Sequence, residues 1–238
     1  MIKREDVINF VKYCEDNLTL KDAEDICEDL YHNLPLCIMD AVYSMGVRYT
    51  SARNVTERYK KYGEAESSES HTVTDFIENV KKEGGCEAFA NNVVKNLQRT
   101  ATRNGILKSE SCCLVAQVLQ ARGIETISDF MSYCDKAELD KAICSTKSQS
   151  SGIMLKYLYM LAGDENMVKP DRMIRRFVKN AGFSKIEDED IVELFRGTVS
   201  ELKGSYPDLT PRALDSAIWL YQRKIKAEKK KDRCHNEA

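Results

Sequence analysis

Residues 143–177 read ICSTKSQSSGIMLKYLYMLAGDENMVKPDRMIRRF and join three unlike parts. Residues 147–152, KSQSSG, form a small polar turn, and residues 152–163, GIMLKYLYMLAG, form a helix that is apolar on nearly every face. A helix of that kind is typical of a position that is buried on all sides. Asp171 then follows Pro170, where a further helix is expected to begin and where an acid is a good cap. Each part alone has an adequate structural explanation.

Apolar residues recur at helical spacing along most of the chain, which has 238 residues but only 11 glycines and 4 prolines. Folds rich in β-strands need more turn residues than this. We therefore expect an all-α fold. Besides residues 152–163, helices are expected at residues 2–11, 19–34, 36–59 (one long or two shorter), 74–82, 87–102, 109–121, 128–133, 136–144, 171–180, 188–203 and 211–230.

The cysteines and the longest apolar run bear on localisation. The chain has nine cysteines, an odd number with irregular spacing, and no charged-then-apolar signal segment opens it. This pattern favours a reducing, intracellular location over a disulfide framework. We expect the protein to be cytoplasmic, or nuclear if its source is eukaryotic. The apolar run 152–163 is too short to span a bilayer and contains Lys156, so no membrane association is expected.

The charge of the chain is nearly balanced but unevenly distributed. Lys and Arg total 36 against 38 acids, which gives a formal charge of −2 and no overall attraction to nucleic acid. Residues 169–179 and 224–233 are nevertheless basic, whereas residues 15–29 and 187–190 are acidic. A local basic face is therefore compatible with the net charge.

The order of the parts in residues 143–177 resembles that of the helix-hairpin-helix DNA glycosylases. In that family a hairpin, usually Leu-Pro-Gly-hydrophobic-Gly, precedes a buried helix and a segment that reads Val-Asp-Thr-His-hydrophobic-x-Arg. Here VKPDRMIRR, residues 168–176, occupies the acid-bearing segment. LCIMDAVYSMGVRYTSARNVTERY, residues 36–59, is similar to the family's early helix pair. NGILKSESCCLVAQVL, residues 104–119, is similar to its glycine segment, which is followed by a basic residue and a helix.

This resemblance implies two helical lobes with a cleft between them. Residues 36–163 would form a central lobe that includes the hairpin, and residues 1–35 and 164–238 would together form the second lobe. The expected partner is double-stranded DNA, from which the target base is flipped out. Breaking its N-glycosidic bond places positive charge on the sugar. The resemblance nominates Asp171 to stabilise that charge and to orient the attacking water.

The resemblance also implies DNA contacts. Backbone N–H groups of a hairpin at the start of a helix can bind a phosphate. The residues implied in DNA binding are Lys147, Ser148, Gln149, Ser150, Ser151, Gly152, Arg172, Arg175 and Arg48, and those implied for a base pocket are Tyr43, Met45 and Tyr159. Ser148 and Ser150 stand where the family has glycines. Core packing is the alternative for each aromatic residue.

No cofactor is expected. Relatives that also cut the strand use a lysine as a Schiff-base nucleophile, and Gly152 occupies that position here, so the resemblance implies no lyase step. Many relatives bind an iron-sulfur cluster through four cysteines after the catalytic helix, but only Cys234 follows Asp171. Core packing is the expected role of the adjacent Cys112 and Cys113.

Two other functions remain open at this stage. A DNA-binding module that has the fold but lacks activity would account for the serine-substituted hairpin, the absent lysine and the slightly acidic charge. A helical interaction protein that does not bind nucleic acid is the third possibility. The sequence does not determine the oligomeric state, and a monomer is favoured.

Overall fold

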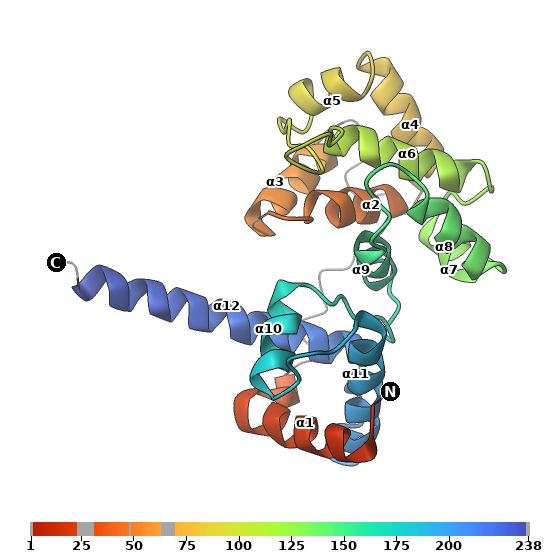
Figure 1. Cartoon of the computed structure of the whole chain (residues 1–238). Helices are drawn as coiled ribbons and strands as arrows, with labels where there is room; N and C mark the ends of the chain where they lie inside the picture. Colours follow the sequence, from red (N-terminus) through yellow and green to blue (C-terminus); the bar gives the residue numbers. More distant parts are fainter. Residues whose placement is uncertain (1, 23–30, 48, 63–69, 237–238) are drawn as a thin grey trace. The chain divides into compact units, whose positions relative to one another are not determined.

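The regular structure of the protein is helical. The computed structural model describes residues 2–22, 31–47, 49–62 and 70–236, and within them it contains helices and one isolated β-bridge, between Arg99 and Leu107 (Figure 1). The elements are α1 (Arg4–Asn17), the 3-10 helix η1 (Leu20–Asp22), α2 (Leu34–Tyr43), α3 (Tyr49–Lys60), α4 (Val73–Lys82), α5 (Cys86–Asn92), α6 (Lys108–Gln120), α7 (Ile127–Ser132), α8 (Lys136–Cys144), α9 (Ile153–Leu161), α10 (Arg172–Asn180), α11 (Asp188–Leu202) and α12 (Pro211–Asn236). The expected all-α class is confirmed. None of the described helices is both long and apolar enough to cross a membrane.

The chain divides into two compact units, each of which we describe by itself. Residues 1–29 and 164–238 belong to the first unit, and residues 30–163 belong to the second. In the first unit α1 packs on α11, while α12 packs on α10 and α11 (Figure 1). A Cβ on Gly197 of α11 would lie 2.9 Å from Val7 Cγ2, so the close approach of α1 and α11 requires glycine there. Segments from opposite ends of the chain thus share one core.

The second unit is built around α2. Every residue of α2 is buried, and the helix contacts α3, α4, α6 and α9. Asn33 caps it, because the Asn33 side chain accepts a hydrogen bond from the Leu36 N–H at 3.2 Å. Helix α9 also contacts α8, and its buried residues are Met154, Leu155, Leu158, Tyr159, Met160 and Leu161. The apolar sequence of α9 therefore follows from its position in the core.

The helix expected at residues 19–34 is described only at its ends, because residues 23–30 lie outside the described residues. Residues 20–22 form η1, and residues 31–33 are not helical.

A second expected helix, residues 87–102, is wrong beyond Asn92. Helix α5 ends there, and the chain continues as an irregular loop in which Thr100 N donates to Ile106 O at 2.9 Å. This loop closes tightly, since a Cβ on Gly105 would lie 2.3 Å from the carbonyl oxygen of Ala101. The β-branched Val93 and Val94 follow α5 directly, and both are buried outside the helix. Tertiary burial of these valines ends the helix where apolar content alone would extend it.

Lys108, the first residue of α6, supports the end of α2. Its side chain is 1% exposed, and its Nζ donates to Tyr43 O at 2.9 Å and to Met45 O at 2.8 Å. The carbonyls at the end of a helix lack partners within the helix, and a cation is favourable there. Burial lowers the pKa of Lys108 to about 8. The ammonium group therefore connects α6 to the C-terminus of α2.

Replacing Lys108 with Met is expected to lower the free energy of unfolding by about 2–4 kcal/mol, because one buried and one partly buried carbonyl group lose a charged donor. Urea unfolding followed by far-UV circular dichroism measures the change. The control is Lys141→Met, on an exposed residue in the last turn of α8, which is expected to change stability by less than about 0.5 kcal/mol. Equal stability of the two variants would show that the Lys108 contacts contribute little.

Candidate functional site

The polar turn before α9 consists of two successive tight turns. Gln149 N donates to Thr146 O and Gly152 N donates to Gln149 O, both at 3.1 Å. Ser148 and Gly152 have positive φ values of 74° and 68°. Gly152 is the N-cap of α9, and no side chain caps the helix. The turn therefore leaves the first N–H groups of α9 without a side-chain acceptor, as a phosphate-binding turn requires.

The side chains of this turn point in different directions. Lys147, Ser150 and Ser151 are exposed, and the exposed Ser148 hydroxyl accepts a hydrogen bond from Thr100 Oγ1 at 2.9 Å. Gln149 is only 1% exposed, and its Nε2 donates to Ser111 Oγ at 2.6 Å. The Gln149 side chain anchors the turn to α6 and does not face the surface. A DNA contact at Gln149 would have to use its backbone.

Two of the three residues expected in a base pocket lie in the core of the second unit. Tyr43 is 1% exposed and Tyr159 is 4% exposed. The Tyr159 ring stacks on Phe130 with centroids 4.7 Å apart, and its hydroxyl donates to Asp140 Oδ1 at 2.7 Å. A flipped base needs an exposed ring face, so Tyr43 and Tyr159 are corrected to core residues. Met45 is half-buried, and Arg48 lies outside the described residues.

Asp171 is the N-cap of α10 in the first unit. Its Oδ1 accepts hydrogen bonds from Met173 N at 2.7 Å and from Ile174 N at 3.1 Å, and the side chain is half-buried. Asp171 therefore has a structural role as a cap, and this role holds its carboxylate in one orientation.

A second carboxyl group, Asp215 of α12, lies beside Asp171 and was not anticipated from the sequence. Asp215 is 6% exposed, and its Oδ2 accepts a hydrogen bond from Lys169 N at 3.1 Å. Burial, together with the negative charge of Asp171, raises the pKa of Asp215 to about 8. At neutral pH this raised pKa favours the protonated form of Asp215. The sequence signal that could reveal Asp215 is its position as an acid on the apolar face of a helix, between the buried Leu214 and Ala217.

Helix α10 has one apolar and one basic face. Met173, Ile174, Phe177 and Val178 are buried. The exposed residues that recur at helical spacing are Arg172, Arg175, Arg176 and Lys179, which we call the α10 basic stripe. Arg175 is partly neutralised, because it forms an ion pair with Asp188 and donates to Pro170 O at 3.2 Å. The stripe begins directly after Asp171, so the structure brings Asp171, Arg172 and Arg175 together at one helix end.

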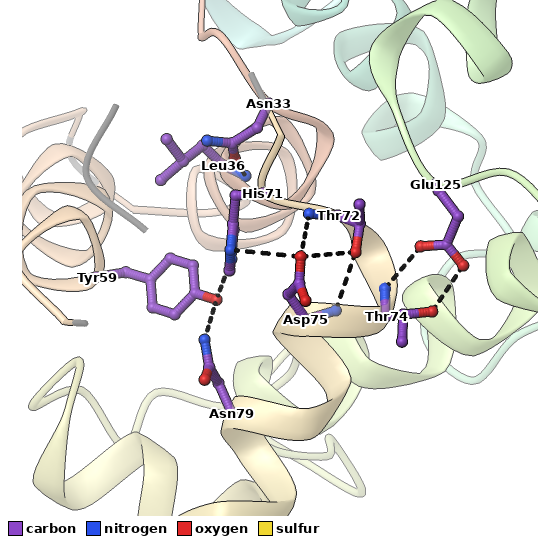
Figure 2. Close-up of polar contacts among 9 residues, drawn as sticks. All are labelled: Asn33, Leu36, Tyr59, His71, Thr72, Thr74, Asp75, Asn79 and Glu125. Atoms are coloured by element: carbon purple, nitrogen blue, oxygen red, sulfur yellow. Dashed lines mark hydrogen bonds and ion pairs between the residues drawn. The ribbon is translucent and has the colours of Figure 1, made fainter. Parts of the chain in front are cut away.

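A buried polar network in the second unit joins α3 to α4 (Figure 2). The Tyr59 hydroxyl lies 2.8 Å from His71 Nε2 and accepts from Asn79 Nδ2 at 3.3 Å, while His71 Nδ1 lies 3.9 Å from Asp75 Oδ2. Burial lowers the pKa of His71, which favours its neutral form. Tyr59 is fully buried, and Asp75 forms a capping box with Thr72 at the start of α4. The network therefore stabilises the core rather than presenting a reactive group to a substrate.

We searched the described part of the chain for a metal site and for a surface hollow that contains expected site residues. No group of three or more His, Cys, Asp and Glu residues there could hold a metal ion. An open surface hollow of about 500 Å³ is lined by Gly84, Glu87, Ala88, Asn91, Asn92 and Leu97. None of these residues belongs to the expected site.

Comparison with known proteins identifies the family. Residues 8–223 match the family described as Domain of unknown function (DUF8548). The chain belongs to the DUF8548 family. No curated protein and no solved structure matches the chain. For this DUF8548 protein, the α10 basic stripe, the Asp171–Asp215 pair and the turn before α9 are the features from which a function can be argued.

Proposed function

We propose that this DUF8548 protein binds double-stranded DNA and acts as a monofunctional base-excision glycosylase with a fold similar to that of the helix-hairpin-helix DNA glycosylases. The observation that carries the proposal is the position of Asp171 at the head of the α10 basic stripe. A basic stripe attracts phosphates without regard to sequence. A carboxylate next to it would lie near the sugar-phosphate backbone, where an N-glycosidic bond is cleaved.

The Asp171–Asp215 pair fits the electrostatic requirement of this reaction. Departure of the base leaves positive charge on the sugar, and a fixed carboxylate stabilises that charge. Of the two carboxyl groups, Asp171 is the more exposed, so it is the one proposed to stabilise that charge. Its two backbone hydrogen bonds use Oδ1, so Oδ2 is the oxygen proposed to face the sugar and the attacking water.

A panel of duplexes that each carry one damaged or mispaired base tests the activity. After incubation with the protein, half of each sample is treated with alkali, which cuts the strand at an abasic site. We expect free base and a strand break that requires alkali for at least one duplex, because no lysine is proposed for a lyase step. Absence of free base from every duplex would contradict the glycosylase proposal.

Binding is tested separately through the α10 basic stripe. The triple variant Arg172→Gln, Arg176→Gln, Lys179→Gln is expected to weaken duplex binding at least about tenfold and to reduce the salt slope, by about 0.9 for each lost phosphate contact. Fluorescence anisotropy of a labelled duplex at several salt concentrations measures both quantities. Arg175 stays unchanged because Asp188 already pairs with it.

The matched control for binding is Lys81→Gln, Lys82→Gln, Lys141→Gln. These three lysines are exposed and lie on α4 and α8, so the change in net charge is the same. We expect the control to bind the duplex almost as the unchanged protein does. Equal weakening of both triple variants would indicate a diffuse charge effect and would remove the α10 basic stripe from the DNA interface.

A catalytically inactive DNA-binding module is the second candidate. The capping role of Asp171 and the use of Gln149 as a buried anchor favour it, since both residues have structural roles that need no reaction. Salt-dependent binding without base release on the panel would support this candidate. A helical interaction protein, the third candidate, would show no duplex binding even at low salt.

A further inference from the structure

Two cysteines that are distant in sequence meet between α5 and α6. Cys86 is the first residue of α5, and Cys113 lies on α6. Their Sγ atoms are 3.2 Å apart, and both thiols are free. A disulfide bond has a length of about 2.05 Å, so bond formation needs an approach of about 1 Å between the sulfurs. The two helices pack against each other, which holds the thiols in place (Figure 1).

The two thiols differ in access and in acidity. Cys86 is half-buried, whereas Cys113 is 7% exposed. When Cys86 is ionised, the Cys113 thiol donates a hydrogen bond to it, and this bond lowers the pKa of Cys86 despite the opposing effects of burial and of the Glu110 charge. The same interaction, with burial, raises the pKa of Cys113. Cys86 is therefore the better nucleophile, since the thiolate is the reactive form.

The surroundings favour this pair over the other thiols. Cys112, which precedes Cys113, is fully buried, and burial raises its pKa. Cys134 is exposed but has no thiol partner among the described cysteines. Besides each other, the charged and titratable groups that act on Cys86 and Cys113 are Glu110 and Cys112. Cys113 in turn contributes to the raised pKa of Tyr43 and of Tyr59.

We propose that Cys86 and Cys113 form a redox site that is oxidised to an intramolecular disulfide by a small disulfide of the glutathione class. The Cys86 thiolate attacks one sulfur of glutathione disulfide, which forms a mixed disulfide and releases one glutathione thiolate. That thiolate takes the proton of Cys113, whose sulfur attacks Cys86 Sγ and displaces the second glutathione as a thiolate, which is protonated by water. In sum, two protein thiols lose two electrons and two protons, and glutathione disulfide becomes two glutathione thiols.

This disulfide would join α5 to α6 and enclose the irregular loop between them. Closing a loop in the unfolded chain lowers its entropy, so the oxidised protein is expected to be the more stable form. Oxidation should therefore raise the Tm by several degrees, and dithiothreitol should reverse the increase. Neither Asp171 nor the α10 basic stripe belongs to this unit, so the redox site does not depend on the proposed glycosylase activity.

The test uses the full-length reduced protein with glutathione disulfide, followed by acid quenching and mass spectrometry of the intact chain and of its peptides. We expect a mass decrease of about 2 Da and a peptide that links Cys86 to Cys113. The variant Cys113→Ser should stop at the glutathione adduct on Cys86, Cys86→Ser should form neither product, and the control Cys134→Ser should behave as the unchanged protein. Because peptide mapping of the unchanged protein needs no variant, the test stands even if Cys113→Ser fails to fold.

A kinetic measurement separates reactivity from mere proximity. Glu110→Gln removes a negative charge that disfavours the Cys86 thiolate, so it is expected to accelerate the first step about two- to fivefold at neutral pH. Three results would overturn the proposal: an unreactive Cys86, a stable glutathione adduct on Cys86 in the unchanged protein, or a disulfide that joins other cysteines.

Discussion

The substitution Asp171→Asn is expected to lower the rate of base release by about 100- to 1,000-fold, because the neutral amide cannot stabilise positive charge on the sugar. Asn is as good an N-cap as Asp, and its Oδ1 can still accept from Met173 N and Ile174 N. The fold and the duplex affinity should therefore change little. Release of free base under single-turnover conditions, on whichever duplex of the panel reacts, measures the effect.

The matched control for Asp171→Asn is Asp135→Asn. Asp135 is the N-cap of α8 and accepts a hydrogen bond from Glu138 N at 2.9 Å, so the same chemical change is made at a cap in the other unit. We expect the control to release base at the unchanged rate. If Asp171→Asn were equally active, Asp171 would be a helix cap without a part in the reaction.

The substitution Asp215→Asn is expected to raise the free energy of unfolding by about 4–6 kcal/mol at pH 8. The pKa of Asp215 is about 8 in the folded protein, against 3.8 for an unperturbed aspartate. Above about pH 4 the unfolded chain releases this proton while the folded protein retains it, at about 1.4 kcal/mol for each pKa unit. The unchanged protein therefore loses stability as the pH rises from about 4 to about 8. Asn cannot ionise, and its oxygen can still accept from Lys169 N.

The pH dependence of stability that we attribute to Asp215 can be measured with the tryptophan fluorescence of the protein. Its single tryptophan, Trp219, lies on α12, one helical turn after Asp215. Urea unfolding followed by Trp219 fluorescence at pH 5, 6.5 and 8 should show a smaller loss of stability with rising pH in Asp215→Asn. The control Asp208→Asn changes an exposed aspartate of the same unit and should retain the full pH dependence. The same slope in both variants would place the pKa of Asp215 near its ordinary value.

The secondary structure follows from local patterns of the sequence, with one informative exception. The helices around the opening stretch, α8, α9 and α10, lie where apolar spacing and caps predict them. Asp171 is the cap that its position after Pro170 indicates. Residues 93–102 depart from the pattern because Val93 and Val94 are buried by tertiary contacts outside a helix. The spacing of apolar residues indicates which residues are buried, but it does not indicate whether they are buried in a helix or in a loop.

Some site residues can be predicted from the sequence, whereas the position of others depends on tertiary contacts. The exposed face of α10 can be derived from a spacing of three and four residues, so the α10 basic stripe is present in the sequence. The inward direction of Gln149, Tyr43 and Tyr159 depends on which helices cover them, and the sequence favoured a surface role for Gln149. Lys108 is a similar case, because a lysine at the start of a helix is ordinarily exposed. Its burial follows from the position of the α2 C-terminus.

The amino-acid sequence by itself determined the all-α class, most of the helix boundaries and the cap at Asp171, because these depend on residues within a few positions of each other. The tertiary structure alone decided that Asp215 is buried where the charge of Asp171 acts on it, and that Cys86 meets Cys113. Asp171 and Asp215 are 44 residues apart in the chain, and Cys86 and Cys113 are 27 residues apart. The pKa of a carboxyl or thiol group is set by what lies within a few ångströms, and chain folding, not sequence spacing, determines those neighbours.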